Sequence, residues 1–78
     1  MTHQEKYAVY NEMFKAIPEL EKKVENHFKD RTIYGIFFSV ADEENRKYFV
    51  DIEVGGSPET YRRIYGTYTL AQLAPIMR

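Results

Sequence analysis

The spacing of apolar residues changes once along this 78-residue chain, near residue 30, and this change limits the folds open to it. Before that point apolar residues recur at steps of three or four, which places them on one face of an α-helix. After it they alternate with other residues, as in strands that bury one face. The pattern predicts one α+β domain over 1–78, with a helical segment followed by a sheet. The helical set is Tyr7, Tyr10, Phe14, Ile17, Leu20, Val24 and Phe28.

The helical segment has a clear start and one interruption. Thr2 and Glu5 form a possible capping box. Pro18 removes a backbone hydrogen bond and clashes with the preceding turn, so the helix either kinks there or is split. Because the apolar spacing keeps its phase across Pro18, we favour two nearly collinear segments on one surface.

Two alternating runs, 32–40 and 48–54, predict a β-hairpin. One register brings their apolar residues together and also pairs Asp42 with Arg46, which have opposite charges. It leaves the loop Glu43-Glu44-Asn45, and Asn45 is a residue that tolerates positive φ. The predicted apolar pairs are Val40–Tyr48, Phe38–Val50, Ile36–Ile52 and Tyr34–Val54.

The segment 57–66 has two interpretations. Ser57-Pro58-Glu59 is typical of a helix start, whereas 60–65 is rich in strand-forming residues. We favour a third strand, because three strands covered by helices form a stable unit and two do not. Thr69 and Gln72 form a capping box that predicts a short C-terminal helix, which we expect to end at Ala74, before Pro75. The expected order is α(α)-β-β-β-α: a three-stranded antiparallel sheet covered by helices on one face.

The composition narrows the classes of protein. There is no cysteine, so no disulfide and no cysteine-based zinc site can form, and stability must come from packing or self-association. The net charge of −1 gives no overall attraction to nucleic acid or to an anionic membrane. No apolar run is long enough to span a membrane, and no signal peptide is expected from the polar N-terminal segment. A cytoplasmic location is therefore expected.

The residue types of common catalytic and metal sites are sparse. The two serines, Ser39 and Ser57, lack the sequence context of a nucleophile, and the two histidines, His3 and His27, lie far apart in the sequence. Gly55-Gly56-Ser57 has no lysine after it and does not match a phosphate-binding loop. We therefore expect no catalytic, cofactor-binding or metal-binding residues, no cofactor and no enzymatic activity.

The strand register assigns side chains to the two faces of the sheet. Phe14, Phe28, Tyr34 and Phe38 are expected in the core. The opposite face, which includes Gly35 and Ser39, keeps many aromatic residues where a solvated face would be polar. Such a surface usually contacts a partner. The candidate partner-binding residues are Ile33, Phe37, Phe49, Asp51, Glu53, Tyr61, Arg63 and Tyr65.

Three uses of this face are open. It can form a homodimer, bind a different protein as an inhibitor or regulator, or stack nucleic-acid bases as an alternative function. The last use needs nearby cations, and the candidates are Arg46, Lys47, Arg62 and Arg63. Alternatively, the C-terminal helix or a helical 57–66 segment covers the face. In size and type the chain is similar to small phage or mobile-element proteins that inhibit larger machines, such as CRISPR effectors. This analogy favours an inhibitor or regulator.

Overall fold

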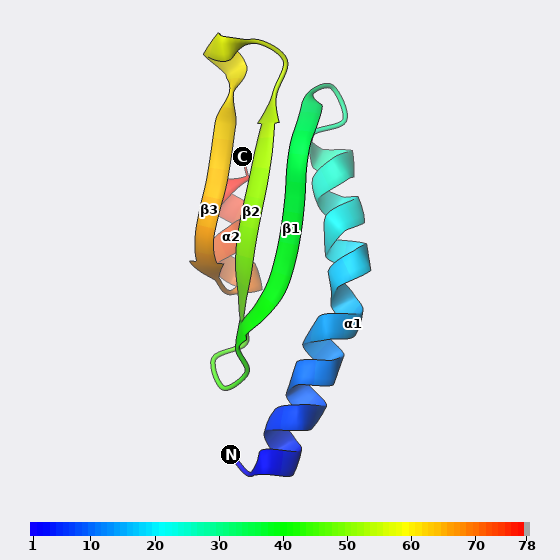
Figure 1. The fold of residues 1–78 in the computed structure, drawn as a ribbon, viewed down its shortest axis with the longest axis vertical. Helices are drawn as coiled ribbons and strands as arrows, with labels where there is room; N and C mark the ends of the chain where they lie inside the picture. Colours follow the sequence, from blue (N-terminus) through cyan, green and yellow to red (C-terminus); the bar gives the residue numbers. More distant parts are fainter. Residues whose placement is uncertain (78) are drawn as a thin grey trace.

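The structure is a computed structural model that describes residues 1–77. Its elements are α1 (His3–His27), β1 (Thr32–Asp42), β2 (Lys47–Gly55), the 3-10 turn η1 (Pro58–Thr60), β3 (Arg62–Tyr68) and α2 (Leu70–Ile76). The strands form one antiparallel sheet in the order β1-β2-β3 (Figure 1). Side chains from both helices, such as Val24 and Leu73, enter one core against the sheet. The expected architecture, with helices on one face of a three-stranded sheet, is confirmed.

Helix α1 runs without a break through Pro18, so the favoured split into two segments is wrong. Figure 1 shows its axis changing direction about midway, in the part that contains Pro18. A bend moves the proline ring away from the preceding turn, and packing on both sides of Pro18 by Ile17 and Val24 holds the helix together. Of the expected capping box, the structure gives the bond to Thr2, whose side-chain oxygen accepts a hydrogen bond from the Glu5 N–H at 3.1 Å.

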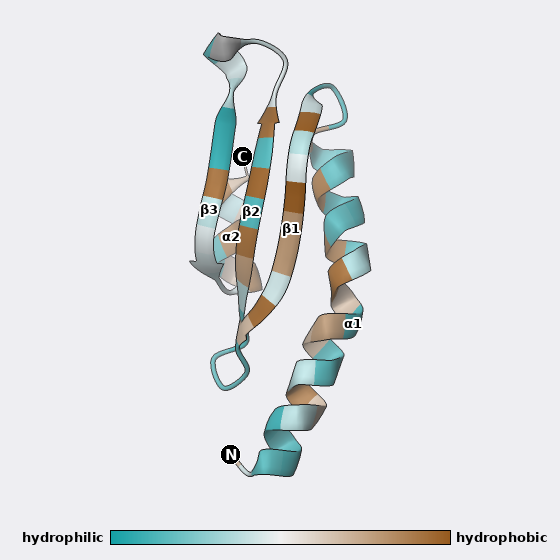
Figure 2. Cartoon of the chain, viewed as in Figure 1, coloured by the Kyte–Doolittle hydropathy of each residue, from teal (hydrophilic) through white to brown (hydrophobic). Residues whose placement is uncertain are grey.

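The core lies between the sheet and the two helices. Val24, Val50, Ile52 and Val54 are the largest fully buried side chains. Full burial of such a side chain contributes about 1.5–3 kcal/mol to stability. Brown and teal bands alternate along β2, because every second residue of this central strand enters the core (Figure 2). The expected core positions of Phe28 and Phe38 are confirmed.

The aromatic residues of the first half of α1 are not in the core. Tyr7, Tyr10 and Phe14 are 67%, 39% and 55% exposed, whereas Met13 and Ile17 are buried. The expectation that Phe14 belongs to the core is therefore wrong. Apolar residues lie on two adjoining sides of this half of the helix, and the sheet covers only one of them.

The β1–β2 register is confirmed in its centre and wrong at both ends. Val40–Tyr48, Phe38–Val50 and Ile36–Ile52 are paired as expected. A register shift between Ile33 and Gly35 places Ile33, rather than Tyr34, opposite Val54. Such a bulge reverses the alternation beyond it. Accordingly, Ile33 packs against the core and Tyr34 is 59% exposed, which is the opposite of the expected assignment for both residues.

The hairpin turn also differs from the expected three-residue loop. A second register shift pairs Asp42 with Lys47 and leaves four residues, 43–46, in the turn. The positive φ belongs to Arg46, at 50°, and not to Asn45. Arg46 does not lie opposite Asp42 as expected. It bonds Glu12 on α1 with its two terminal guanidinium nitrogens, at 3.2 and 3.3 Å.

Asp42 instead organises the turn itself. Its carboxylate accepts hydrogen bonds from the Asn45 side chain at 2.7 Å and from the backbone N–H groups of Glu44 and Asn45. These bonds, chiefly the one from the Asn45 side chain, hold the pKa of Asp42 below its ordinary value of 3.8. The ionised form is the one that the turn stabilises.

A lowered carboxyl pKa predicts how the turn responds to acid. The stabilisation is present above the pKa of the unfolded chain and is lost as the pH falls through the lower folded value. We expect an NMR titration of Asp42 to have its midpoint below 3.8, with the Glu44 amide signal moving at the same pH. Asn45→Ala is expected to move the midpoint back toward 3.8. A wild-type midpoint at or above 3.8 would contradict this account.

The last third of the chain contains the favoured third strand. β3 spans Arg62–Tyr68, and the helix-like signal before it forms only the short turn η1. The capping box that starts α2 is confirmed in both directions between Thr69 and Gln72. The helix does not end at Ala74 as expected, because it continues through Pro75 to Ile76. His27 contacts the Met77 carbonyl oxygen at 2.6 Å, which joins the ends of the two helices.

Candidate interaction face of the sheet

The sheet face opposite the helices, here called the outer face, holds seven of the eight candidate partner-binding residues. Strand pairing sets Glu53 opposite Arg63 and Asp51 between Phe37 and Tyr65. Ile64, between Arg63 and Tyr65, is 3% exposed, so its neighbours point outward as expected. The exception is Ile33, which the bulge turns toward the core. The outer-face residues among the candidates are Phe37, Phe49, Asp51, Glu53, Tyr61, Arg63 and Tyr65.

Three of these side chains form an aromatic cluster across all three strands. Phe37 and Phe49 meet edge to face, with ring centroids 6.3 Å apart, and Phe49 meets Tyr65 in the same way at 5.1 Å. Phe37 and Tyr65 are 54% and 55% exposed. Edge-to-face geometry is favourable for aromatic pairs, so these ring contacts give the cluster a defined shape.

A charged network adjoins this cluster. Arg63 bonds both carboxylate oxygens of Asp51 at 3.1 Å and lies 3.4 Å from a carboxylate oxygen of Glu53. The hydrogen bonds to Asp51 raise the pKa of the Arg63 guanidinium above its ordinary value. The guanidinium also lies over the Tyr65 ring, 4.5 Å from its centroid. The network therefore connects the charged side chains to the aromatic cluster.

Two further tyrosines lie at the end of the face near η1. Tyr61 donates a hydrogen bond to Glu53 at 3.2 Å, and its ring centroid is 6.4 Å from that of Tyr34. Desolvation, with a smaller contribution from the bond to Glu53, raises the pKa of Tyr61. With Gly56 and Ser57, the two rings line a shallow hollow. Sequence reasoning missed Tyr34 here, because nothing in the alternating pattern marks the bulge that turns it outward.

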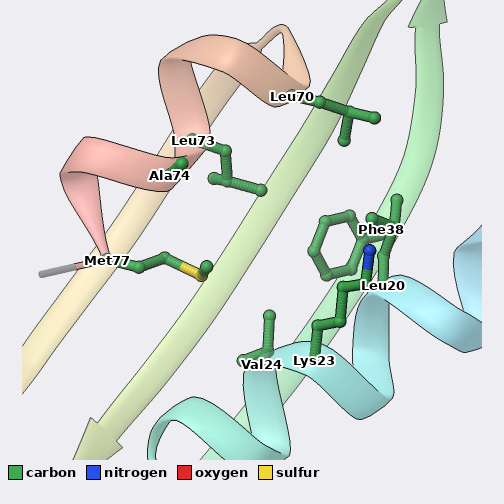
Figure 3. Close-up of a pocket in the computed structure, with 8 residues that line it drawn as sticks. All are labelled: Leu20, Lys23, Val24, Phe38, Leu70, Leu73, Ala74 and Met77. Carbon is green, nitrogen blue, oxygen red and sulfur yellow. The ribbon is translucent and has the colours of Figure 1, made fainter.

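The outer face is not covered by the segments that could have hidden it. α2 lies on the other side, where its Leu73 is buried in the core. Between α1 and α2 is a hollow of about 190 Å³, lined by Leu20, Lys23, Phe38 and Met77 among others (Figure 3). Lys23 is the one charged residue in that lining.

The cations considered for nucleic-acid binding do not gather on the outer face. Arg46 bonds Glu12 at the hairpin tip, and Arg62 bonds the Ile76 carbonyl oxygen of α2. Lys47 lies opposite Asp42 in the β1–β2 register, next to the hairpin turn. Arg63 lies on the face, but two carboxylates hold it. Within residues 1–77, these four cations therefore do not form a basic surround for the aromatic cluster.

Two features are absent from residues 1–77. No group of three or more His, Asp or Glu side chains is placed to hold a metal ion there. No helix within the same residues is long and apolar enough to cross a membrane. Comparisons of the chain with protein-family models, with curated proteins and with solved structures find no match.

Proposed function

We propose that the chain is a small protein-binding protein without catalytic activity of its own, which inhibits or regulates a larger protein through the outer face. The observation that carries the proposal is the aromatic cluster Phe37–Phe49–Tyr65, which spans three strands and is left uncovered by both helices. Exposed apolar residues gathered in this way usually mark a contact surface. We also propose a cytoplasmic location, which rests on the cysteine-free sequence.

The chemistry of the face suits a protein partner. Tyr34, Phe37, Tyr61 and Tyr65 are each more than half exposed. Tyr, Phe and Arg are enriched at the centres of protein interfaces, where they bury much area for few rotatable bonds. Asp51 and Arg63 already pair with each other, so a partner that covers them does not have to supply an opposite charge.

A nucleic acid is the less favoured partner. The charged side chains of the network, Asp51, Glu53 and Arg63, sum to one negative charge in the middle of the aromatic residues. A phosphate backbone near this network would be repelled. Protein binding therefore remains the proposal.

The test is comparative affinity capture from the native host lysate, followed by mass spectrometry. Three baits are compared: the wild-type chain, the Phe37→Glu variant and the Tyr65→Glu variant. We expect one specific partner with the wild type and a loss of at least about tenfold with either variant, because a buried glutamate replaces a central aromatic contact. Leu70→Glu is the matched control, since Leu70 is 49% exposed but lies on the helix side of the sheet.

Two outcomes would overturn the proposal. Equal recovery of the partner by Phe37→Glu, Tyr65→Glu and the wild type would place the contact elsewhere. Light scattering gives the second outcome: a stable dimer that Phe37→Glu dissociates would make a second copy the occupant of the face. Circular dichroism of each variant shows that it is folded, which we expect because the substituted side chains lie outside the core.

A further inference from the structure

The hollow between α1 and α2 lies on the side of the sheet opposite the outer face (Figure 3). The sheet contributes Phe38 to its lining, and the other lining residues belong to α1 and to the segment from Leu70 to Met77. Phe38, Val24 and Leu73 are buried, whereas Leu70 is about half exposed. The hollow therefore has a buried apolar base and an opening to solvent.

Contacts at both ends of α2 hold the hollow in shape. A capping box fixes the first turn of this helix. At its other end, His27 Nε2 of α1 contacts the Met77 carbonyl oxygen at 2.6 Å, and Arg62 of β3 bonds the Ile76 carbonyl oxygen. The helix is therefore tied both to α1 and to the sheet. A site that is already formed loses less free energy to ordering when a ligand binds.

One cation belongs to this apolar lining. Lys23 is the one charged residue there, and in Figure 3 its side chain extends from α1 with the nitrogen toward Phe38. Within residues 1–77, Lys23 forms no ion pair, not even with Glu19 one helical turn before it. Ligand sites in proteins combine apolar walls with a few polar groups that fix the orientation of the ligand. The Lys23 ammonium is placed to do this for a negatively charged group.

The volume limits the size of a ligand. The hollow measures about 190 Å³. An apolar cavity of about 150 Å³ in another protein stays dry and binds benzene. The hollow therefore fits one apolar body of about six to eight carbon atoms.

We propose that the hollow binds a small organic monocarboxylate. Its apolar body lies against Leu20, Leu70 and Leu73, and its carboxylate pairs with the Lys23 ammonium. One ammonium group matches one monoanion, whereas a phosphate dianion needs more donors than this lining supplies. This site is separate from the outer face and would remain even if that face bound nothing.

The probes are sodium octanoate, its uncharged analogue octanamide, and sodium butanoate. Each is titrated into the protein to millimolar concentration, with the NMR methyl signals of Val24, Leu73 and Met77 as the readout. We expect octanoate to bind about fivefold more tightly than octanamide, because only the acid pairs with Lys23. Butanoate is expected to bind at least about tenfold more weakly than octanoate, because it has four fewer methylene groups to bury.

Substitutions separate the role of the charge from that of the walls. Lys23→Met keeps an apolar stem and is expected to weaken octanoate binding by about fivefold while leaving octanamide unchanged. Lys22→Met removes the same charge at an exposed position outside the lining, and we expect its effect on octanoate to stay within about twofold. Leu70→Ala removes part of one wall and is expected to weaken both compounds by about threefold.

Several results would overturn the inference. Unchanged methyl signals at millimolar octanoate would mean that the hollow is closed to ligands. Equal affinities for octanoate and octanamide, or an unchanged affinity of Lys23→Met for octanoate, would exclude the pairing with the carboxylate. Shifts of the Phe37 and Tyr65 ring signals in place of those of Val24 and Leu73 would move binding to the outer face. Methyl shifts that rise with protein concentration alone would assign the hollow to a second copy.

Discussion

Replacing Ile52 with alanine is expected to lower the free energy of unfolding by about 3–4 kcal/mol. Ile52 is 0% exposed in the central strand, between Ile36 on β1 and Ile64 on β3. The cavity left by the smaller side chain cannot close, because the sheet holds the flanking backbones on both sides. The free energy of unfolding of a 78-residue chain without disulfides is only a few kcal/mol, so the variant should be largely unfolded near 37 °C.

Urea denaturation followed by circular dichroism measures this effect. Ile52→Val is the graded control, since it deletes one methylene group and is expected to lower stability by about 1 kcal/mol. Equal stabilities of Ile52→Ala and the wild type would show that the core is not centred on β2.

Replacing Gly66 with alanine is the second large expected effect, a loss of about 1–3 kcal/mol. Gly66 lies within β3 at a φ of 148°, a backbone conformation that side-chain-bearing residues rarely adopt. An added Cβ would also approach the Tyr68 hydroxyl oxygen at 3.2 Å and the ring carbon next to it at 3.3 Å. Both the strain and the crowding act on the strand that contributes Arg63 and Tyr65 to the outer face.

The chain offers a matched control for this substitution. Gly35 lies in β1, where an added Cβ would make an ordinary contact of 3.5 Å with Glu53. Gly35→Ala is therefore expected to be neutral or to stabilise the protein by a few tenths of a kcal/mol, through the lower entropy of the unfolded chain. Thermal unfolding of the two variants side by side tests the pair. Equal losses of stability by Gly66→Ala and Gly35→Ala would mean that the positive φ of Gly66 has no effect on stability.

Ile52→Ala and Gly66→Ala are expected to change folding, whereas Phe37→Glu and Tyr65→Glu are expected to change binding. The core side chains lie on the helix side of the sheet, whereas Phe37 and Tyr65 are more than half exposed on the other side. A glutamate at either exposed position removes little buried area. Loss of a partner by these variants can therefore be assigned to the outer face itself, provided that their unfolding free energies match that of the wild type.

Periodicity and capping residues determined most of the secondary structure. Strict alternation identifies β1 and β2, because a strand with one buried face shows a period of two. The central register followed from matching apolar residues, and the Thr69–Gln72 box marks the start of α2, because both signals act between neighbouring groups. Seven of the eight candidate residues lie on the outer face for the same reason.

Only the tertiary structure decided where those patterns break. Ile33 and Tyr34 exchange faces at a bulge, which depends on how the end of β1 meets Val54. α1 continues through Pro18 because residues on both sides of it are buried, and this packing outweighs the local preference to end. Tyr7, Tyr10 and Phe14 have the spacing of a buried face, yet a residue is buried only where a second element covers it. That depends on the position of α1 relative to the sheet. Contacts between distant parts of the chain set this position, and no local pattern encodes it.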